Sequence, residues 1–419
     1  MENLFLYITI FIIVLTLLIS LIPKSKKKSA PISVLQEPLL LEPISQGKEK
    51  EEGKLSLKEL KKINAQNEKQ QKAKSKRKII NPEHPSFVNS FKGFGDEITD
   101  ISFSTNYIAI ACKDKSLKLF KLKQIADENP FYYLLNMNIN YPTSVSFNSL
   151  NENWLVCGLS QEKTMEIFEF KEFDANKKYF HSYKKFPTNL HKGEVKNVYF
   201  VNNTCLISFG GGSDTTIKVW NSNCELLTTI DTKQVKHHCS TISFTNKFLF
   251  VGSWCPDVKV FEVKLEKTDK SFKSLAKIMD LGLHKTGIDY ISCSQNEEKA
   301  LTISQDKTVR IWNINMEYDP KCLLTVDMRK NEYFGENCNI TAGDVAVGKD
   351  GKGLIALAEK NNIALVGLGD FKLKEMIEKA HSEDSVIKMV RFLNVEGQVY
   401  LFSYGGLDCR INIFKINLN

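Results

Sequence analysis

Short runs of alternating apolar and polar residues recur along most of the chain, and each ends on a bulky side chain. The clearest runs are Thr216 to Trp220 and Thr308 to Trp312, and each follows a turn that carries an aspartate. In a β-strand every second side chain faces the same side of the sheet, so these runs predict strands with one face buried.

The runs repeat at a nearly constant interval. Seven bulky anchors, spaced 41 to 54 residues apart, are Phe120, Phe168, Trp220, Phe261, Trp312, Val366 and Phe414. An aspartate stands six residues before four of them, at Asp114, Asp214, Asp306 and Asp408. An internal repeat of about 40 to 50 residues is the sequence signature of a propeller blade, so we expect seven blades.

Further strand patterns precede several anchors, at 98–103, 195–200, 288–293 and 386–392. One four-stranded unit cannot cover its own apolar faces, whereas radial stacking into a ring buries them. The sequence therefore predicts an all-β, seven-bladed propeller over residues 86–419. The run FVNSF at 87–91 precedes the first blade, and we predict that it closes the ring as the outermost strand of blade seven, beside 411–416.

Two units carry a fuller set of polar residues. Blade three has His191, Ser208, Asp214 and Trp220, and blade five has His284, Thr302, Asp306 and Trp312. These residues resemble the repeat of the WD-repeat (WD40) family, which implies a propeller in which each set is a buried structural tetrad. Blade seven has His381, Ser403 and Asp408, with Phe414 in place of the tryptophan.

The amino-terminal residues form one long apolar run. Residues 4 to 22 contain no charge, glycine or proline, and as a helix they would span about 28 Å, enough for a thin bilayer. A cleaved signal peptide is the competing interpretation, but no small-residue cleavage pattern follows. Lysines follow instead, from Lys24 to Lys28. We predict that residues 1–23 are a single transmembrane anchor with the propeller in the cytosol.

Residues 24–85 have the composition of a tether, with five prolines and few aromatic residues. Such a segment buries too little apolar surface to fold alone and is predicted to be disordered. Ser56 and Glu59 have the spacing of a capping box, so a partly formed helix over 56–78 is predicted.

Positive charge concentrates in the tether. Residues 54–78 hold ten cations and two anions, a net charge of +8, which equals the net charge of the whole chain. The cluster Lys72, Lys74, Lys76, Arg77 and Lys78 ends this stretch. It suits RNA or ribosome phosphates or anionic lipid head groups, and a simple solvated linker is the third interpretation.

The ten cysteines show no zinc-ligand spacing, and several lie in strand patterns, which favours free thiols in a reducing compartment. Two triplets, beginning at Asn202 and Asn339, match the glycosylation signal and favour the opposite, a secretory lumen.

The residue patterns contain no phosphate loop, nucleophile elbow or paired carboxylates, so neither an enzyme, a cofactor, a metal site nor a small-molecule substrate is predicted. His237, His238 and Cys239 stand together, but without a second ligand cluster they are read as a loop or strand start.

The turn between the second and third strands of blade four is unusual. Trp254 and Pro256 flank a cysteine that replaces the aspartate, and Asp257 follows. An exposed tryptophan is a preferred anchor for protein contacts, so Trp254, Pro256 and Asp257 are the predicted partner-binding residues. The alternative, that Trp254 fills a gap left by the missing tetrad, stays open.

Residues 213–263 resemble more narrowly the WD-repeat proteins of the endoplasmic-reticulum membrane. That resemblance implies an adaptor associated with a stress-sensing kinase and with translation under stress. We therefore expect a non-enzymatic scaffold at the cytosolic face of that membrane. The alternative is a WD-repeat exchange factor for a coat-assembly GTPase, but that family places its membrane span after the propeller.

Overall fold

The computed structural model describes residues 82–418 except 138, 174–176, 315–319 and 349–350. The predicted anchor, the possible helix and the basic cluster of the tether lie outside these residues. Within the described part, no helix is long and apolar enough to cross a bilayer.

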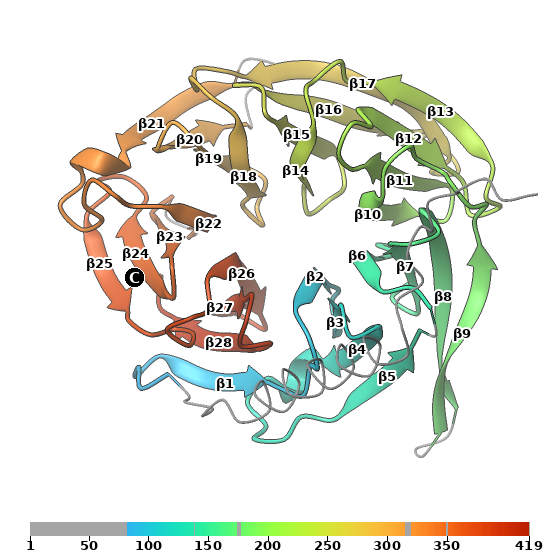
Figure 1. Cartoon of the computed structure of the whole chain (residues 1–419), viewed down its shortest axis with the longest axis horizontal. Coiled ribbons are helices and arrows are strands. Elements are labelled where there is room, and N and C mark those ends of the chain that lie inside the picture. The colour runs from blue at the N-terminus through green and yellow to red at the C-terminus, as the bar shows by residue number, and fades with distance from the viewer. Residues whose placement is uncertain (1–81, 138, 174–176, 315–319, 349–350, 419) are drawn as a thin grey trace, which may run out of the picture. The chain divides into compact units, whose positions relative to one another are not determined.

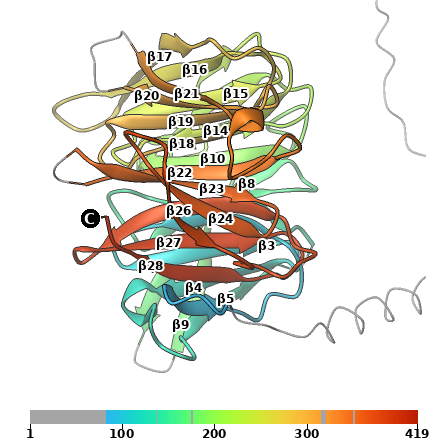
Figure 2. The same ribbon diagram turned by 90° about the vertical axis from the view of Figure 1, so that its left-hand side faces the viewer.

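Seven antiparallel sheets of four strands each are arranged around a central channel, which confirms the predicted all-β propeller (Figure 1). Each sheet is a blade, and its strands run between the two faces of the ring (Figure 2). One face of the ring holds the connections that lead into the innermost strands and the turns between the second and third strands. We call it the entry face. The opposite face is the exit face.

The strands are numbered from the channel outward within each of the first three blades. They are β2 (Ile98–Phe103), β3 (Tyr107–Cys112), β4 (Ser116–Lys121) and β5 (Tyr132–Asn136) in blade one; β6 (Pro142–Phe147), β7 (Trp154–Leu159), β8 (Thr164–Phe173) and β9 (Lys177–Lys185) in blade two; and β10 (Val195–Asn202), β11 (Cys205–Gly210), β12 (Thr216–Trp220) and β13 (Leu226–Asp231) in blade three.

The next three blades follow the same order. They are β14 (His237–Ile242), β15 (Phe248–Ser253), β16 (Val258–Leu265) and β17 (Phe272–Leu281) in blade four; β18 (Ile288–Cys293), β19 (Lys299–Ser304), β20 (Thr308–Asn313) and β21 (Lys321–Asp327) in blade five; and β22 (Ile340–Val347), β23 (Gly353–Glu359), β24 (Asn362–Gly367) and β25 (Leu373–Ile377) in blade six.

Blade seven combines both ends of the described chain. Its strands are β26 (Ile387–Val395), β27 (Gln398–Gly405), β28 (Ile411–Ile416) and the outermost strand β1 (Phe87–Phe91). Among the residues that the structure describes, two single-turn 3₁₀ helices, η1 (Leu122–Gln124) and η2 (Met328–Lys330), lie in connections.

The predicted closing strand is confirmed. β1 pairs antiparallel with β28, with Phe91 opposite Ile411, and lies beside it in Figure 1. Phe91 is fully buried and its ring stacks on Phe120 of blade one, with centroids 4.3 Å apart. The first strand of the described residues therefore joins the last blade to the first.

All seven innermost strands share one irregularity. Each has a register shift between its first and third residues, at Ile98/Asp100, Pro142/Ser144, Val195/Asn197, His237/Cys239, Ile288/Tyr290, Ile340/Ala342 and Ile387/Met389. A bulge at the same position in every blade bends each innermost strand in the same way and identifies equivalent residues in all seven blades.

Side chains on the innermost strands tie each of several blades to the next. The Asp100 carboxylate accepts from Ser144 Oγ at 2.6 Å and from Val145 N at 3.0 Å. The equivalent residue in the next blade, Ser144, accepts from Val198 N at 3.2 Å. Backbone donors on the channel-side edge of these strands are thus satisfied by the neighbouring blade.

The same link recurs two residues farther along these strands. Ser102 Oγ accepts from Phe147 N at 3.1 Å, and Ser146 Oγ accepts from Phe200 N at 3.0 Å. At the junction of blades six and seven, the Asp344 carboxylate accepts from Phe392 N at 2.7 Å.

The four polar residues of blade three form one buried chain. His191 Nε2 lies 2.8 Å from Ser208 Oγ, and His191 Nδ1 lies 3.0 Å from the Asp214 carboxylate. Trp220 Nε1 donates to Ser208 Oγ at 3.0 Å. A fully satisfied polar network of this kind rigidifies the sheet that contains it.

Blade five repeats the arrangement. His284 Nε2 lies 2.8 Å from Thr302 Oγ1, which accepts from Trp312 Nε1 at 2.9 Å. His284 Nδ1 lies 3.4 Å from Asp306 and 3.0 Å from Thr308 Oγ1.

In blade seven, His381 bonds to Ser403 at 2.9 Å and to Asp408 at 2.7 Å. Phe414 occupies the tryptophan position in that blade.

The chains of blades three and five hold neutral histidines beside charged aspartates. Burial lowers the pKa of His284 to about 4, against the opposing effect of Asp306. Burial alone would raise the pKa of Asp214, but hydrogen bonds from Thr216 and from Lys192 N outweigh it and lower the value to about 2. At neutral pH the Asp214 carboxylate is therefore an acceptor and the His284 imidazole is uncharged.

The histidine chains predict a loss of stability in mild acid. Unfolded His284 takes up a proton below about pH 6.5, whereas the folded residue resists protonation until about pH 4. Acid in this window favours the unfolded state, by up to about 1.4 kcal/mol per pH unit. His284→Gln should be less stable at pH 7 and show a shallower pH dependence in urea unfolding. The exposed His181→Gln should keep the original slope, and equal slopes in both variants would contradict the mechanism.

Ring closure predicts a large cost for removing the Phe91 ring. Phe91→Ala should lower the free energy of unfolding by about 3–5 kcal/mol, because it empties a fully packed site between two blades. Phe131→Ala provides the control, since 59% of that side chain is exposed. Urea unfolding of the two variants should separate them clearly, and similar losses would mean that β1 does not hold the ring shut.

Candidate functional site

Blade four lacks the polar chain of its neighbours. By position, Gln234 replaces the tetrad histidine, Val251 replaces the hydroxyl residue and Cys255 replaces the aspartate. Gln234 Nε2 donates to Asp257 O at 3.1 Å, but its buried Oε1 has no partner in the described structure. In this blade a looser set of contacts therefore replaces the hydrogen bonds among histidine, hydroxyl and carboxylate.

The two entry-face loops of blade four are nevertheless fastened to each other. Trp254 N donates to Val235 O at 3.1 Å, and Val235 N donates to Cys255 Sγ at 3.4 Å. The second bond replaces the one that Asp214 accepts from Lys192 N in blade three. Gly287 of blade five lies against the Trp254 backbone, because a Cβ there would approach Trp254 Cα to 2.9 Å.

The Trp254 side chain lies open to solvent on this fixed backbone. It is 53% exposed, and Val235 beside it is 59% exposed. Lys236 Nζ lies 4.4 Å from the centre of the indole ring, a cation–π contact. Exposure of the ring favours a docking role over the filling of a gap between blades.

The two loops that contact the Trp254 backbone carry lysines. The loop before β14 carries Lys233 and Lys236, and the loop before β18 carries Lys285, all of them exposed. Lys233 and Lys236 adopt left-handed backbone conformations with φ of 53° and 47°, which turn the loop sharply. We call Val235, Lys236 and Trp254 the tryptophan platform.

The structure places the other predicted residues differently. Pro256 is exposed next to the platform, whereas Asp257 is half-buried and its carbonyl serves Gln234. The eight tetrad residues lie inside blades three and five. Lys72, Lys74, Lys76, Arg77 and Lys78 lie outside the described residues.

The histidine pair in blade four does not assemble a ligand set. His237 opens β14 and is buried, with its Nε2 2.6 Å from Thr232 Oγ1. His238 faces elsewhere and lies 3.8 Å from Asp289. Across the described residues, no three His, Cys, Asp or Glu side chains gather closely enough to hold a metal ion.

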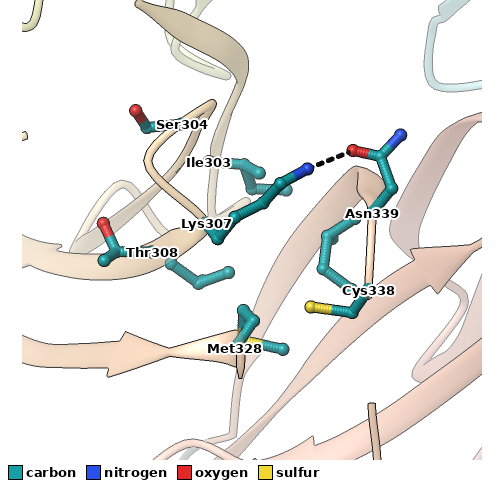
Figure 3. A pocket seen from close by; sticks show the side chains of 9 residues that line it. Ile303, Ser304, Lys307, Thr308, Met328, Cys338 and Asn339 are labelled. Atoms are coloured by element: carbon teal, nitrogen blue, oxygen red, sulfur yellow. Dashed lines mark hydrogen bonds between the residues drawn. The ribbon is translucent and has the colours of Figure 1, made fainter. Parts of the chain in front are cut away.

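A narrow crevice lies on the entry face between blades five and six (Figure 3). Lys307 Nζ donates to Asn339 Oδ1 at 2.9 Å across it. Its volume of about 10 Å³ admits a single water molecule, so it is too small for a substrate.

Sequence reasoning missed Val235 and Lys236 as parts of the platform. The available signal was a short turn in which an apolar residue lies between two lysines, Lys233 and Lys236. Their contact with Trp254 depends on loop pairing, which the residue pattern alone does not specify.

Comparisons with known proteins agree with the propeller. No protein-family model matches the chain. Transducin beta-like protein 2 of Mus musculus is 26% identical over 307 residues, which cover 72% of this chain and 67% of the relative. The Homo sapiens protein of the same name is 24% identical over 303 residues, covering 72% and 66%.

The aligned length is large enough to include most of the propeller. The chain is therefore a distant homologue of transducin beta-like protein 2, built as a seven-bladed propeller consistent with the WD-repeat fold.

Proposed function

We propose that this protein is a non-enzymatic scaffold, anchored in the endoplasmic-reticulum membrane, that recruits protein partners on the entry face of its propeller. The observation that carries the proposal is the tryptophan platform, where an exposed indole stands on a backbone fixed by two hydrogen bonds. Trp is the residue type most enriched among binding hot spots, and a rigid platform loses little entropy on binding.

The buried polar groups support a scaffold rather than an enzyme. His191 and His284 are held in structural chains inside blades, with no access to a substrate. Among the channel residues, the Asp100 carboxylate is used in ties between blades.

The membrane anchor rests on the apolar run at 4–22 and the lysines that follow it. A cytosolic propeller agrees with the cysteines, since all ten are free thiols. Burial raises the pKa of Cys112, Cys205 and Cys293 to about 12, so these thiols stay protonated within the sheets. The first glycosylation triplet also fits poorly with a lumenal propeller, because Asn202 is buried and its Nδ2 donates to Lys270 O.

The name of the relatives states no binding partner, so association with a stress-sensing kinase and with translation control is proposed from the sequence resemblance. The basic tether would add contacts to RNA, ribosome or anionic lipid, since ten cations face only two anions over residues 54–78.

The platform predicts that one substitution separates binding from stability. Trp254→Ala should reduce partner capture in proximity labelling by the full-length protein, because the main apolar contact is removed. Its free energy of unfolding should change by no more than about 0.5 kcal/mol, since the ring is largely exposed. Phe131→Ala removes a ring of similar exposure, 59%, from the connection before β5 and should leave these partners in place. Unfolding of the Trp254→Ala variant would favour a packing role instead.

The proposed topology predicts the fate of the propeller in intact microsomes. Added protease should digest it, and Asn339 should carry no glycan. Asn339 is the informative site, because it is exposed whereas Asn202 is buried. A protected propeller with a glycan on Asn339 would place it in the lumen.

A further inference from the structure

A second hollow lies on the exit face, away from the tryptophan platform. It is a cavity of about 420 Å³, within the size range of ligand-binding pockets. Residues from four blades line it: Phe244, Gln295, Asn296, Val345, Ala346, Val347, Phe392, Asn394, Val399 and Leu418. The residues of blades four and five lie in the turns that follow β14 and β18. Those of blades six and seven lie at the ends of β22 and β26 and at the start of β27, and Leu418 lies near the end of the chain.

The hollow lies beside a junction where the tie between blades differs. Ser292 of blade five occupies the position at which Ser102 and Ser146 accept from the next blade. Its buried Oγ accepts from no backbone N–H of blade six in the described structure and lies close to the Asp344 carboxylate of that blade instead. Blade six also has small residues here, including Ala346, which is only 8% exposed. The small side chains leave space at this end of the channel.

The walls are nevertheless held in place. Asn394 N of blade seven donates to Gln295 Oε1 of blade five at 3.0 Å. Glu297 of blade five accepts from Thr245 Oγ1 at 2.7 Å, which fixes the turn that carries Phe244. A preformed hollow loses little entropy when a ligand fills it.

The lining combines apolar side chains with polar ones and carries no charged side chain. Its polar groups are three carboxamides, whose oxygens are already used inside the protein: Gln295 Oε1 by Asn394 N, Asn296 Oδ1 by Ser294 Oγ, and Asn394 Oδ1 by Gly397 N. Within the described part of the chain, their amide nitrogens have no hydrogen-bond partner. The site therefore offers apolar surface together with N–H donors.

This combination selects one class of ligand. A carboxylate or phosphate would enter without a cation to pair with, at a high desolvation cost. A purely hydrocarbon ligand would bury the amide donors without acceptors. Peptide carbonyl groups satisfy the donors, and uncharged apolar side chains fill the volume.

We infer that the exit-face cavity binds a short, uncharged apolar segment of a partner polypeptide. Phe244, 63% exposed at the rim, would cover the bound side chains, and the carboxamides would donate to the peptide backbone. The ring then has two docking sites on opposite faces and can hold two partners at once. This site is independent of the tryptophan platform.

The test uses a random heptapeptide phage library selected on the full chain. Selected peptides, labelled with fluorescein, are then measured by fluorescence polarisation against variants. Phe244→Asp and Val347→Lys place a charge in the lining and should each weaken binding at least tenfold. Leu150→Asp is the matched control, because Leu150 lies in the corresponding turn of blade two, is 68% exposed and is not in the lining.

Trp254→Ala should also leave these peptides bound. Urea unfolding of each variant separates a loss of binding from a loss of folding. Phe244 and Val347 are both at least partly exposed, so the two variants provide independent tests. Two results would overturn the inference: selection of peptides rich in charged residues, or peptides whose affinity is unchanged by both lining substitutions. Either result would leave the platform proposal intact.

Discussion

The ring depends on satisfying the channel-side edges of its innermost strands. These strands pair with a neighbour on only one side, so their other edge presents backbone donors without a strand partner. In the first three blades, side-chain oxygens of Asp100, Ser102, Ser144 and Ser146 accept those donors from the next blade. Hydrogen bonds of this kind fix the spacing of the blades. That spacing determines how the loops are arranged on both faces of the ring.

The blades differ in how much internal polar structure they retain. Blades three, five and seven hold histidine chains, whereas blade four has lost all of its tetrad members. The tryptophan platform lies on that blade, and the exit-face cavity lies beside the junction at which Ser292 accepts no backbone donor from the next blade. Both candidate sites thus occur where the repeat departs from its own pattern, and its regular parts supply the support.

Much of this architecture could be predicted from the residues. Strand alternation and a nearly constant interval specify the number of blades, because both depend on local periodicity. The strand at 87–91 could be assigned to blade seven, because a closed ring requires every sheet to have four strands. His191, Asp214 and Trp220 could be grouped because their spacing matches that of His284, Asp306 and Trp312.

Other features depend on contacts that periodicity does not encode. The cavity brings together Phe244, Gln295, Val347 and Asn394, which are separated by about 150 residues in the chain. No run of residues marks them, since Phe244 and Gln295 are ordinary turn residues and Val347 and Asn394 are ordinary residues near the ends of strands. The pairing of Val235 with Trp254 likewise follows from two loops meeting, and sequence alone left the orientation of that tryptophan open.

The position of β1 has a mechanical consequence. Residues before 87 continue directly into the strand that seals the ring, so tension arriving along the chain from that direction reaches the hydrogen bonds between β1 and β28 first. The stacked rings of Phe91 and Phe120 share that load with blade one. A pull from the amino-terminal side would therefore open the propeller at its seam while the remaining six blades stay folded against each other.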